Sequence, residues 1–126
     1  FTPLHKDVFR SYSWSTNISG TKKWTLFPVE DSSFLFGGFQ GKETVWDIRE
    51  WEHSEELQKK FPNFNKARKI ECIQKTGETI FVPSGWYHQV ENLEDTISIN
   101  HNWGNACNID LFWDFLLLEL SEVEEE

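Results

Sequence analysis

The sequence is poor in several residue types: it has no Met, only two Cys, and only 12 basic residues against 21 acidic ones, a formal charge of −9. Two cysteines without a CxxC pair exclude a disulfide-dense scaffold and the common zinc motifs, and Cys72 and Cys107 are predicted to be buried free thiols. The shortage of Lys and Arg argues against direct nucleic-acid binding, because displacing phosphate counterions requires positive charge. No apolar run approaches the roughly 18 residues of a membrane span, and the first residues lack the pattern of a signal peptide. We therefore expect no membrane partner and a cytoplasmic or nuclear location.

Large aromatic side chains are abundant instead, since they make up 16% of the chain, with seven Trp and eleven Phe. A chain of 126 residues forms one compact domain at most, and these side chains are sufficient to fill its core. The absence of an initiator Met, and the aromatic pattern from the first residue onward, lead us to expect a fragment that begins inside a domain. We divide it into a core over residues 1–120 and a solvated acidic tail over residues 121–126.

Residue alternation predicts short strands for most of the chain. Residues 11–18 alternate with a period of two, and a turn at Gly20 is predicted to join them to a strand over residues 22–27 as a hairpin. The Phe- and Gly-rich residues 30–41 are predicted to be a loop that covers another part of the molecule. Further strands are predicted over residues 69–74, 79–82, 87–91 and 96–103. This succession of short strands indicates a β-sandwich or barrel.

Two helices are predicted. Residues 52–60 have a helix-forming composition, with Ser54 as a candidate N-cap and Pro62 ending the element. Residues 109–120 are strongly apolar, which indicates a helix buried on most of its faces.

Two histidines and an aspartate are candidate metal ligands. His5 and Asp7 are one residue apart, so an extended segment places both side chains on one face, whereas His88 shares a strand face with Val90. Taken singly, these residues are better interpreted as a surface His–Asp pair and a core histidine. Together they form the pattern of the facial triad of non-haem Fe(II) oxygenases, which leaves three coordination positions open. A structural zinc site would instead need four protein ligands.

The open positions suit a bidentate 2-oxo acid together with dioxygen. Such a cosubstrate has a far carboxylate that needs a buried cation. Lys22 and Lys23 are the candidates, and because they lie on opposite faces of one strand, the pattern does not choose between them. In an ordinary strand both side chains would extend into water.

Five parts of the sequence resemble the jumonji C family of Fe(II)- and 2-oxoglutarate-dependent oxygenases, and the resemblance covers nearly the whole chain. They are residues 2–7 (TPLHKD), Trp14, residues 20–28 (GTKKWTLFP), residues 77–88 (GETIFVPSGWYH) and residues 92–103 (NLEDTISINHNW). The resemblance implies an all-β fold with minor helix: a double-stranded β-helix, the jelly-roll or cupin-like barrel, here incomplete at its N-terminal side and followed by a C-terminal helix.

The resemblance also implies roles for eight residues. His5, Asp7 and His88 fall on the iron ligands of the family, and Lys22 falls on the position that pairs with the far carboxylate of 2-oxoglutarate. Four others fall on positions that line the cosubstrate or substrate pocket: Thr2, Ser15, Asn100 and Asn102. His101 and His53 are expected to be structural and solvated, respectively.

The implied function is that of a dioxygenase with Fe(II), 2-oxoglutarate and dioxygen. The resemblance to the small hydroxylase branch implies hydroxylation of a lysyl residue in a protein, with a translation termination factor as the expected substrate. Two alternatives remain open: a histone N-methyl-lysine demethylase that uses the same iron site, and a non-catalytic jelly-roll binding module.

Overall fold

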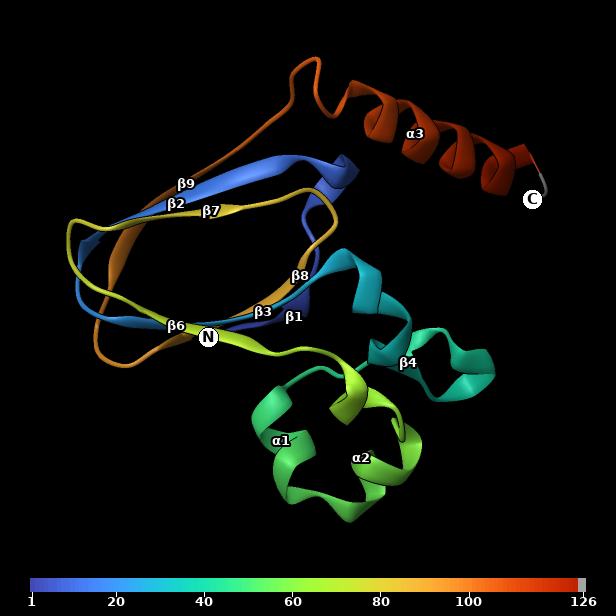
Figure 1. The fold of residues 1–126 in the computed structure, drawn as a ribbon, viewed down its shortest axis with the longest axis horizontal. Coiled ribbons are helices and arrows are strands. Elements are labelled where there is room, and N and C mark those ends of the chain that lie inside the picture. Colours follow the sequence, from blue (N-terminus) through green and yellow to red (C-terminus); the bar gives the residue numbers. More distant parts are fainter. Residues whose placement is uncertain (125–126) are drawn as a thin grey trace.

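The computed structural model describes residues 1–124, which form two antiparallel sheets that face each other as a flattened barrel, as Figure 1 shows. The larger sheet has the order β1 (Thr2–His5), β8 (Tyr87–Asn92), β3 (Lys22–Phe27), β6 (Ile70–Gln74). The smaller sheet has the order β7 (Thr79–Val82), β2 (Tyr12–Ser19), β9 (Ile97–Trp103). The predicted all-β barrel followed by a helix is confirmed.

A separate layer covers the outer face of the four-stranded sheet. It comprises the chain between β3 and β6, with η2 (Val29–Leu35), β4 (Phe36–Gly37), η3 (Phe39–Gly41), β5 (Glu43–Thr44), α1 (Ile48–His53), α2 (Glu55–Lys60) and η4 (Phe64–Lys66). Its apolar side chains and those of the sheet form the main core: Leu4, Phe27, Leu35, Val45, Ile48, Phe61, Phe64, Ala67 and Tyr87. The stretch of residues 30–41, predicted to cover another part of the molecule, is part of this layer.

The prediction of a hairpin between the first two long strands is wrong. β2 pairs with β7 and β9, whereas β3 pairs with β6 and β8, so the two strands lie in opposite sheets. Gly20 adopts a φ of 88°, and a Cβ there would lie 2.3 Å from the carbonyl oxygen of Asp95. The turn therefore carries the chain from one sheet to the other, and it packs against the loop that leads into β9.

The predicted helix over residues 52–60 is two short helices instead of one. Ser54 has extended backbone angles (φ −120°, ψ 110°) that separate α1 from α2. Its hydroxyl accepts a hydrogen bond from the backbone N–H of Leu57 at 3.3 Å, which is the N-cap interaction that the sequence predicted, at the start of the second helix.

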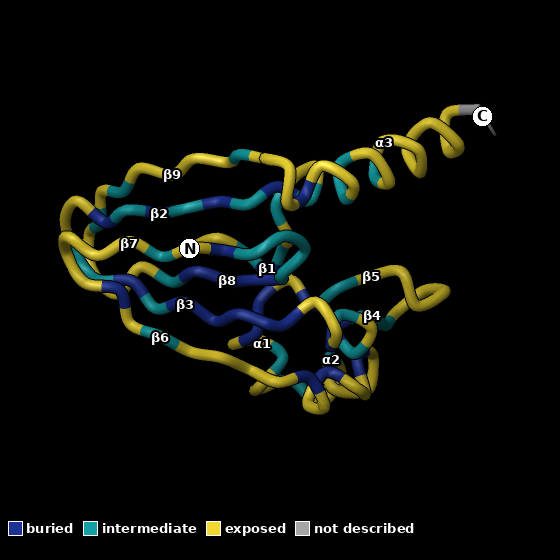
Figure 2. Tube along the Cα trace, turned by 45° about the horizontal axis from the view of Figure 1, so that its top comes forward, coloured by how far each residue is buried: buried dark blue, intermediate teal, exposed yellow. Residues whose placement is uncertain are grey.

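The prediction that the C-terminal helix is buried on most faces is also wrong. α3 runs from Ile109 to Glu124 and projects from one end of the barrel, and Figure 2 shows that most of its length is exposed. Its packing partner is η1 (Val8–Arg10), where Phe9 meets Phe115 edge to face at 5.6 Å between ring centroids. The helix includes the first residues of the predicted acidic tail, whose last two lie outside the described residues.

Two further findings concern the cysteines and membrane-spanning helices. Both cysteines are free, as predicted, but Cys72 is half-buried and Cys107 is exposed, because Cys107 lies in the turn before α3. Within residues 1–124, no helix combines the length and apolar character needed to cross a membrane.

The inner lining of the barrel is polar along β2. On β2 and just before it, the small residues Ser11, Ser13, Ser15 and Asn17 are buried inside the barrel, whereas the intervening Tyr12, Thr16 and Ile18 face outward. This sheet therefore turns its polar face to the interior, where a polar ligand site needs hydrogen-bonding groups.

Candidate metal centre

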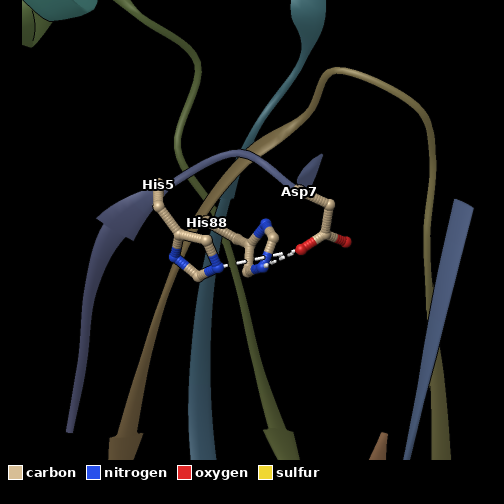
Figure 3. Close-up of side chains that lie close together, drawn as sticks. All are labelled: His5, Asp7 and His88. Carbon is tan, nitrogen blue, oxygen red and sulfur yellow. Dashed lines mark ion pairs between the residues drawn. The ribbon is translucent and has the colours of Figure 1, made fainter. Parts of the chain in front are cut away.

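The three predicted metal ligands converge at one end of the barrel. His5 ends β1 and pairs in register with His88 on β8, while Asp7 follows in the turn after β1. The Nε2 atoms of both histidines lie 3.7 Å from the same Asp7 oxygen, Oδ1, as Figure 3 shows. One ligand atom from each residue lies within 4.8 Å of the others. The donor set of two imidazole nitrogens and one carboxylate oxygen is that of a facial triad.

Backbone carbonyl groups determine which nitrogen of each imidazole is free. The Nδ1 of His5 is 2.8 Å from the carbonyl oxygen of Pro3, and the Nδ1 of His88 is 3.2 Å from that of Trp86. A carbonyl oxygen only accepts, so each Nδ1 carries the proton and donates it. Each Nε2 then has a free lone pair that points toward the common centre, which is the usual arrangement of a metal-binding histidine.

His88 is held in the neutral state that a metal ligand requires. The ring is buried, and this burial lowers its pKa, as does the neighbouring His5, whereas Asp7 acts in the opposite direction. The ring of Trp24 stacks on His88 with 5.7 Å between centroids, and its indole N–H donates to the buried side chain of Gln74 at 2.7 Å. Gln74 and Trp24 therefore fix the orientation of this ligand from inside the barrel.

Asp7 is oriented by a residue of the opposite sheet. The hydroxyl of Ser13 on β2 donates to the second carboxylate oxygen of Asp7, Oδ2, at 2.5 Å. Because Oδ2 is engaged, Oδ1 is the oxygen that faces both histidines. Ser13 and Trp24 were missed as site residues, although the alternation of residues 11–17 placed Ser13 on one face with Ser15, and Trp24 shares a strand face with Lys22.

A cavity of about 240 Å³ opens onto the triad. It is lined by eleven residues: Thr2, His5, Asp7, Ser13, Trp14, Ser15, Trp24, His88, Val90, Asn100 and Asn102. Seven of the eight site residues predicted from the sequence are among them, and Lys22 is the one that is not. Three strands of the larger sheet and two strands of the smaller sheet thus bring together residues that are up to one hundred positions apart in sequence.

Lys22 lies further along the interior of the barrel. It shares its strand face with Trp24, is buried, and extends its Nζ across the barrel to the hydroxyl of Ser98 on β9 at 2.6 Å. Burial lowers its pKa, and no carboxylate within residues 1–124 pairs with it. Lys23 points the other way and forms an ion pair with Glu71 at 2.9 Å. Of the two lysines that the pattern left open, Lys22 is the one available to an anionic ligand inside the barrel.

The residues present fit Fe(II) and 2-oxoglutarate. The triad offers N, N and O ligands with open positions on the cavity side, as non-haem Fe(II) prefers. The hydroxyl of Ser15 is buried in this cavity without a hydrogen-bond partner, so it is free to bind a polar ligand. Lys22 supplies a buried cation for a carboxylate. The other two histidines take no part, since His101 and His53 are exposed.

Comparison with known proteins agrees with this geometry. A sequence model of the family described as the cupin-like domain matches residues 1–109. The "2-oxoglutarate and iron-dependent oxygenase JMJD4" of Danio rerio is 53% identical over 129 residues, which is 100% of this chain and 29% of that protein. Residues 10–17 and 98–103 lead us to predict a similarity to jumonji domain-containing protein 4, and the identity over the whole chain confirms this similarity.

Other relatives carry different names. The "Arginine-specific demethylase JMJ20" of Arabidopsis thaliana is 53% identical over 125 residues, 99% of this chain and 26% of that protein. The less similar "Bifunctional arginine demethylase and lysyl-hydroxylase psr-1" of Caenorhabditis elegans is 34% identical over 116 residues, 89% of this chain and 29% of that protein. The chain thus spans less than a third of the length of these curated relatives. The match over most of its residues and the barrel with its triad show that the chain belongs to the cupin-like domain family, with jumonji C oxygenases as its relatives.

Proposed function

We propose that this protein is an Fe(II)- and 2-oxoglutarate-dependent oxygenase that hydroxylates a protein substrate. The observation that carries the proposal is the convergence of His5, Asp7 and His88, each with a free ligand atom, on a cavity with polar walls. When bound, iron and 2-oxoglutarate supply the oxidising chemistry: dioxygen is split, 2-oxoglutarate becomes succinate and carbon dioxide, and one oxygen atom enters a substrate C–H bond.

The side chains of the barrel have separate tasks in this proposal. His5, Asp7 and His88 hold the metal on one side only and leave its other positions to ligands from the cavity. Lys22 binds the far carboxylate of the cosubstrate, and the hydroxyl of Ser15, which lies buried without a partner, forms a hydrogen bond with the cosubstrate. Thr2, Asn100 and Asn102 line the cavity and orient cosubstrate or substrate.

Relatives support protein as the substrate class. The name of the Caenorhabditis elegans relative includes lysyl-hydroxylase, and those of two relatives include arginine demethylase. We propose lysyl hydroxylation of a translation termination factor in the cytoplasm as the specific activity, in line with the small hydroxylase branch that the sequence resembles.

The experiment is an assay of the protein with Fe(II), 2-oxoglutarate and a purified termination factor. Succinate formation that depends on iron, together with the mass gain of one oxygen atom on a single lysine of the factor, is the expected result. A His88→Ala variant serves as the control, and it should form no succinate. If the wild-type protein binds iron and 2-oxoglutarate yet leaves the factor unmodified, the substrate is wrong while the oxygenase chemistry stands.

Arginine demethylation is the second candidate, because a relative that is 53% identical is named as an arginine-specific demethylase. Hydroxylation of an N-methyl carbon yields a product that releases formaldehyde, so the same site serves both reactions. Mass spectrometry separates them, since a demethylated arginine loses the mass of one methylene group. The sequence also leaves open a histone N-methyl-lysine demethylase. That activity would remove the mass of one methylene group from a lysine, and its substrate would be in the nucleus.

If neither iron nor 2-oxoglutarate binds to the folded protein, it is a jelly-roll binding module and both enzymatic candidates fail.

A further inference from the structure

A second cavity lies beside the metal centre, on the outer side of the four-stranded sheet. Its volume is about 350 Å³, and it is lined by Lys6, Arg10, Val29, Ser32, Phe36, Ser84, Gly85, Tyr87 and Leu111. None of these residues lines the cavity of the triad. The two sites are nevertheless neighbours in the chain, because Lys6 lies between His5 and Asp7 and Tyr87 precedes His88. Tyr87 points away from the barrel interior, since successive side chains of a strand alternate.

The charge of this second cavity is opposite to that of the protein. The chain carries a formal charge of −9, yet Lys6 and Arg10 line the cavity and no carboxylate does. Arg49 and Arg68 each form ion pairs with carboxylates, whereas Arg10 has no such partner within the described chain. The Nζ of Lys6 lies over the ring of Tyr87 at 5.8 Å from its centroid and has no carboxylate partner among residues 1–124 either.

The backbone holds Arg10 in an uncommon conformation. Phe9 and Arg10 have φ values of 54° and 53°, in the left-handed region that non-glycine residues rarely adopt, and they are adjacent. The contact of Phe9 with Phe115 of α3 fixes this turn. Two successive residues in this region persist only where the surrounding structure enforces them, and such positions cluster at binding sites.

The remaining walls combine apolar surface with hydroxyl groups. Val29, Phe36 and Leu111 supply the apolar part. The hydroxyl oxygen of Ser84 accepts a hydrogen bond from the buried amide of Asn108 at 3.2 Å, which leaves its own proton free to donate. A guanidinium, an ammonium and a hydroxyl thus face a space that is otherwise apolar.

We propose that this second cavity binds a carboxylate attached to an apolar body, with Arg10 as its principal partner and Lys6 as a second cation. A carboxylate matches the two parallel N–H donors of an arginine, and Arg10 is a half-buried cation without a carboxylate partner among the described residues, which favours an anion. Lys6 is exposed and adds its charge at the edge of the cavity. The apolar walls accommodate the hydrocarbon part of the ligand, and the volume is sufficient for a small organic acid. The same chemistry is provided by a free organic acid and by an acidic side chain next to an apolar one in a protein.

The test is a titration of the isotopically labelled protein with hexanoate, followed by the backbone amide signals of Gly85 and Leu111. We expect saturable shifts at both amides, no comparable shift with the uncharged hexanol, and weaker binding of inorganic phosphate, which lacks the apolar body. Arg10→Gln should weaken hexanoate binding by at least about tenfold, the effect of losing a charge-assisted hydrogen bond. Arg10→Lys keeps the charge but not the paired donors. Its affinity for hexanoate should lie between those of the wild-type protein and of Arg10→Gln.

Two matched controls separate this site from other cationic groups. Lys66→Gln and Lys23→Gln each remove one positive charge from a lysine that does not line the cavity, and both should leave the shifts at Gly85 and Leu111 unchanged. Equal binding of hexanol, tighter binding of phosphate, or unchanged affinity in a folded Arg10→Gln protein would overturn the proposal. A peptide with adjacent Leu and Glu that displaces hexanoate, while its Gln counterpart does not, identifies a protein segment as the source; otherwise the source is a free acid.

Discussion

The two sheets of the barrel divide the work of the site and differ in how they are covered. The four-stranded sheet carries His5, His88 and Lys22, and its outer face is buried under the layer formed between β3 and β6. The three-stranded sheet contributes hydroxyl and amide groups from its inner face, and its outer face exposes apolar side chains such as Phe81 and Ile99.

This difference places the charged groups and the neutral hydrogen-bonding groups mainly on different walls. The charged and metal-binding groups stand on the sheet that is buried on both sides, where packing restricts their rotamers. The hydrogen-bonding groups stand on the sheet that is buried on one side only. Ser13 connects this sheet to Asp7, and Ser98 connects it to Lys22, each by a hydrogen bond. The predictions that follow test each wall separately.

The largest effect is expected from His88→Ala on the four-stranded sheet. The substitution removes one of three metal ligands, so metal binding and turnover should be abolished while the barrel remains folded. An anaerobic titration with Fe(II) and then 2-oxoglutarate measures this, since a chelated keto acid gives a visible charge-transfer band. His101→Ala, on the exposed face of the other sheet, is the control and should keep the band and measurable turnover. An inactive His101 variant beside an active His88 variant would refute the ligand assignment.

The next largest effect is expected in the free energy of unfolding, when an aromatic side chain is removed from the outer face of either sheet. Phe27→Ala removes a ring that is 1% exposed in the covered core, and we expect a loss of about 3–5 kcal/mol in the free energy of unfolding. Phe81→Ala, on the three-stranded sheet, removes a ring that is 52% exposed and should cost about 1 kcal/mol or less. Denaturant unfolding of the two variants measures the difference. Equal losses would mean that the outer face of the smaller sheet is covered in solution.

Lys22→Ala should weaken 2-oxoglutarate binding without changing metal affinity. The substitution removes a charge-assisted interaction of about 1.5–3 kcal/mol, which corresponds to roughly 10- to 150-fold in the dissociation constant. Titration of the metal-loaded protein with 2-oxoglutarate gives this value. Lys23→Ala, which breaks the surface pair with Glu71, is the matched control and should behave like the wild type. If Lys23→Ala weakens 2-oxoglutarate binding and Lys22→Ala does not, the cosubstrate is bound by the opposite face of β3.

Ser13→Ala tests the hydrogen bond that Ser13 on β2 donates to Asp7. Loss of the hydrogen bond to Asp7 Oδ2 frees the carboxylate to rotate, and the affinity for Fe(II) should fall by about 10- to 100-fold, the usual range for partners of metal ligands. Ser13→Thr retains the hydroxyl and should restore most of the affinity. Ser11→Ala removes a buried hydroxyl from the same face, one that accepts a hydrogen bond from Asn102, and should leave metal affinity unchanged. A similar loss in Ser11→Ala would indicate a general effect of strand packing.

Much of this architecture was predictable from local pattern. The strands at residues 69–74, 79–82, 87–91 and 96–103 were predicted close to their observed bounds because period-two alternation and turn residues are local signals. The His5–Asp7 spacing and a distant His88 indicated a facial triad, because the geometry of a metal restricts the residues that bind it. The resemblance to jumonji C oxygenases chose Lys22 over Lys23 and added Thr2, Ser15, Asn100 and Asn102, which line the cavity.

Other features depended on how the strands were assembled. Alternation shows that β2 has two different faces, but only the closure of the barrel decides that the serine face is inside and that Ser13 reaches Asp7. A turn at Gly20 was evident, but whether β2 and β3 pair or separate depends on long-range partners such as β9 and β8. The apolar composition of residues 109–120 indicated a helix correctly, whereas its exposure depends on which surface the rest of the chain offers it.

The sequence by itself therefore determined the element types, the metal-binding donor set and the family. The tertiary structure alone decided which face of each strand is inside, that Ser13 reaches Asp7, and that Lys6 and Arg10 meet over one cavity. The physical reason is that hydrogen-bond periodicity and ligand chemistry are set by neighbouring residues, whereas burial and ion pairing depend on groups brought together from distant parts of the chain.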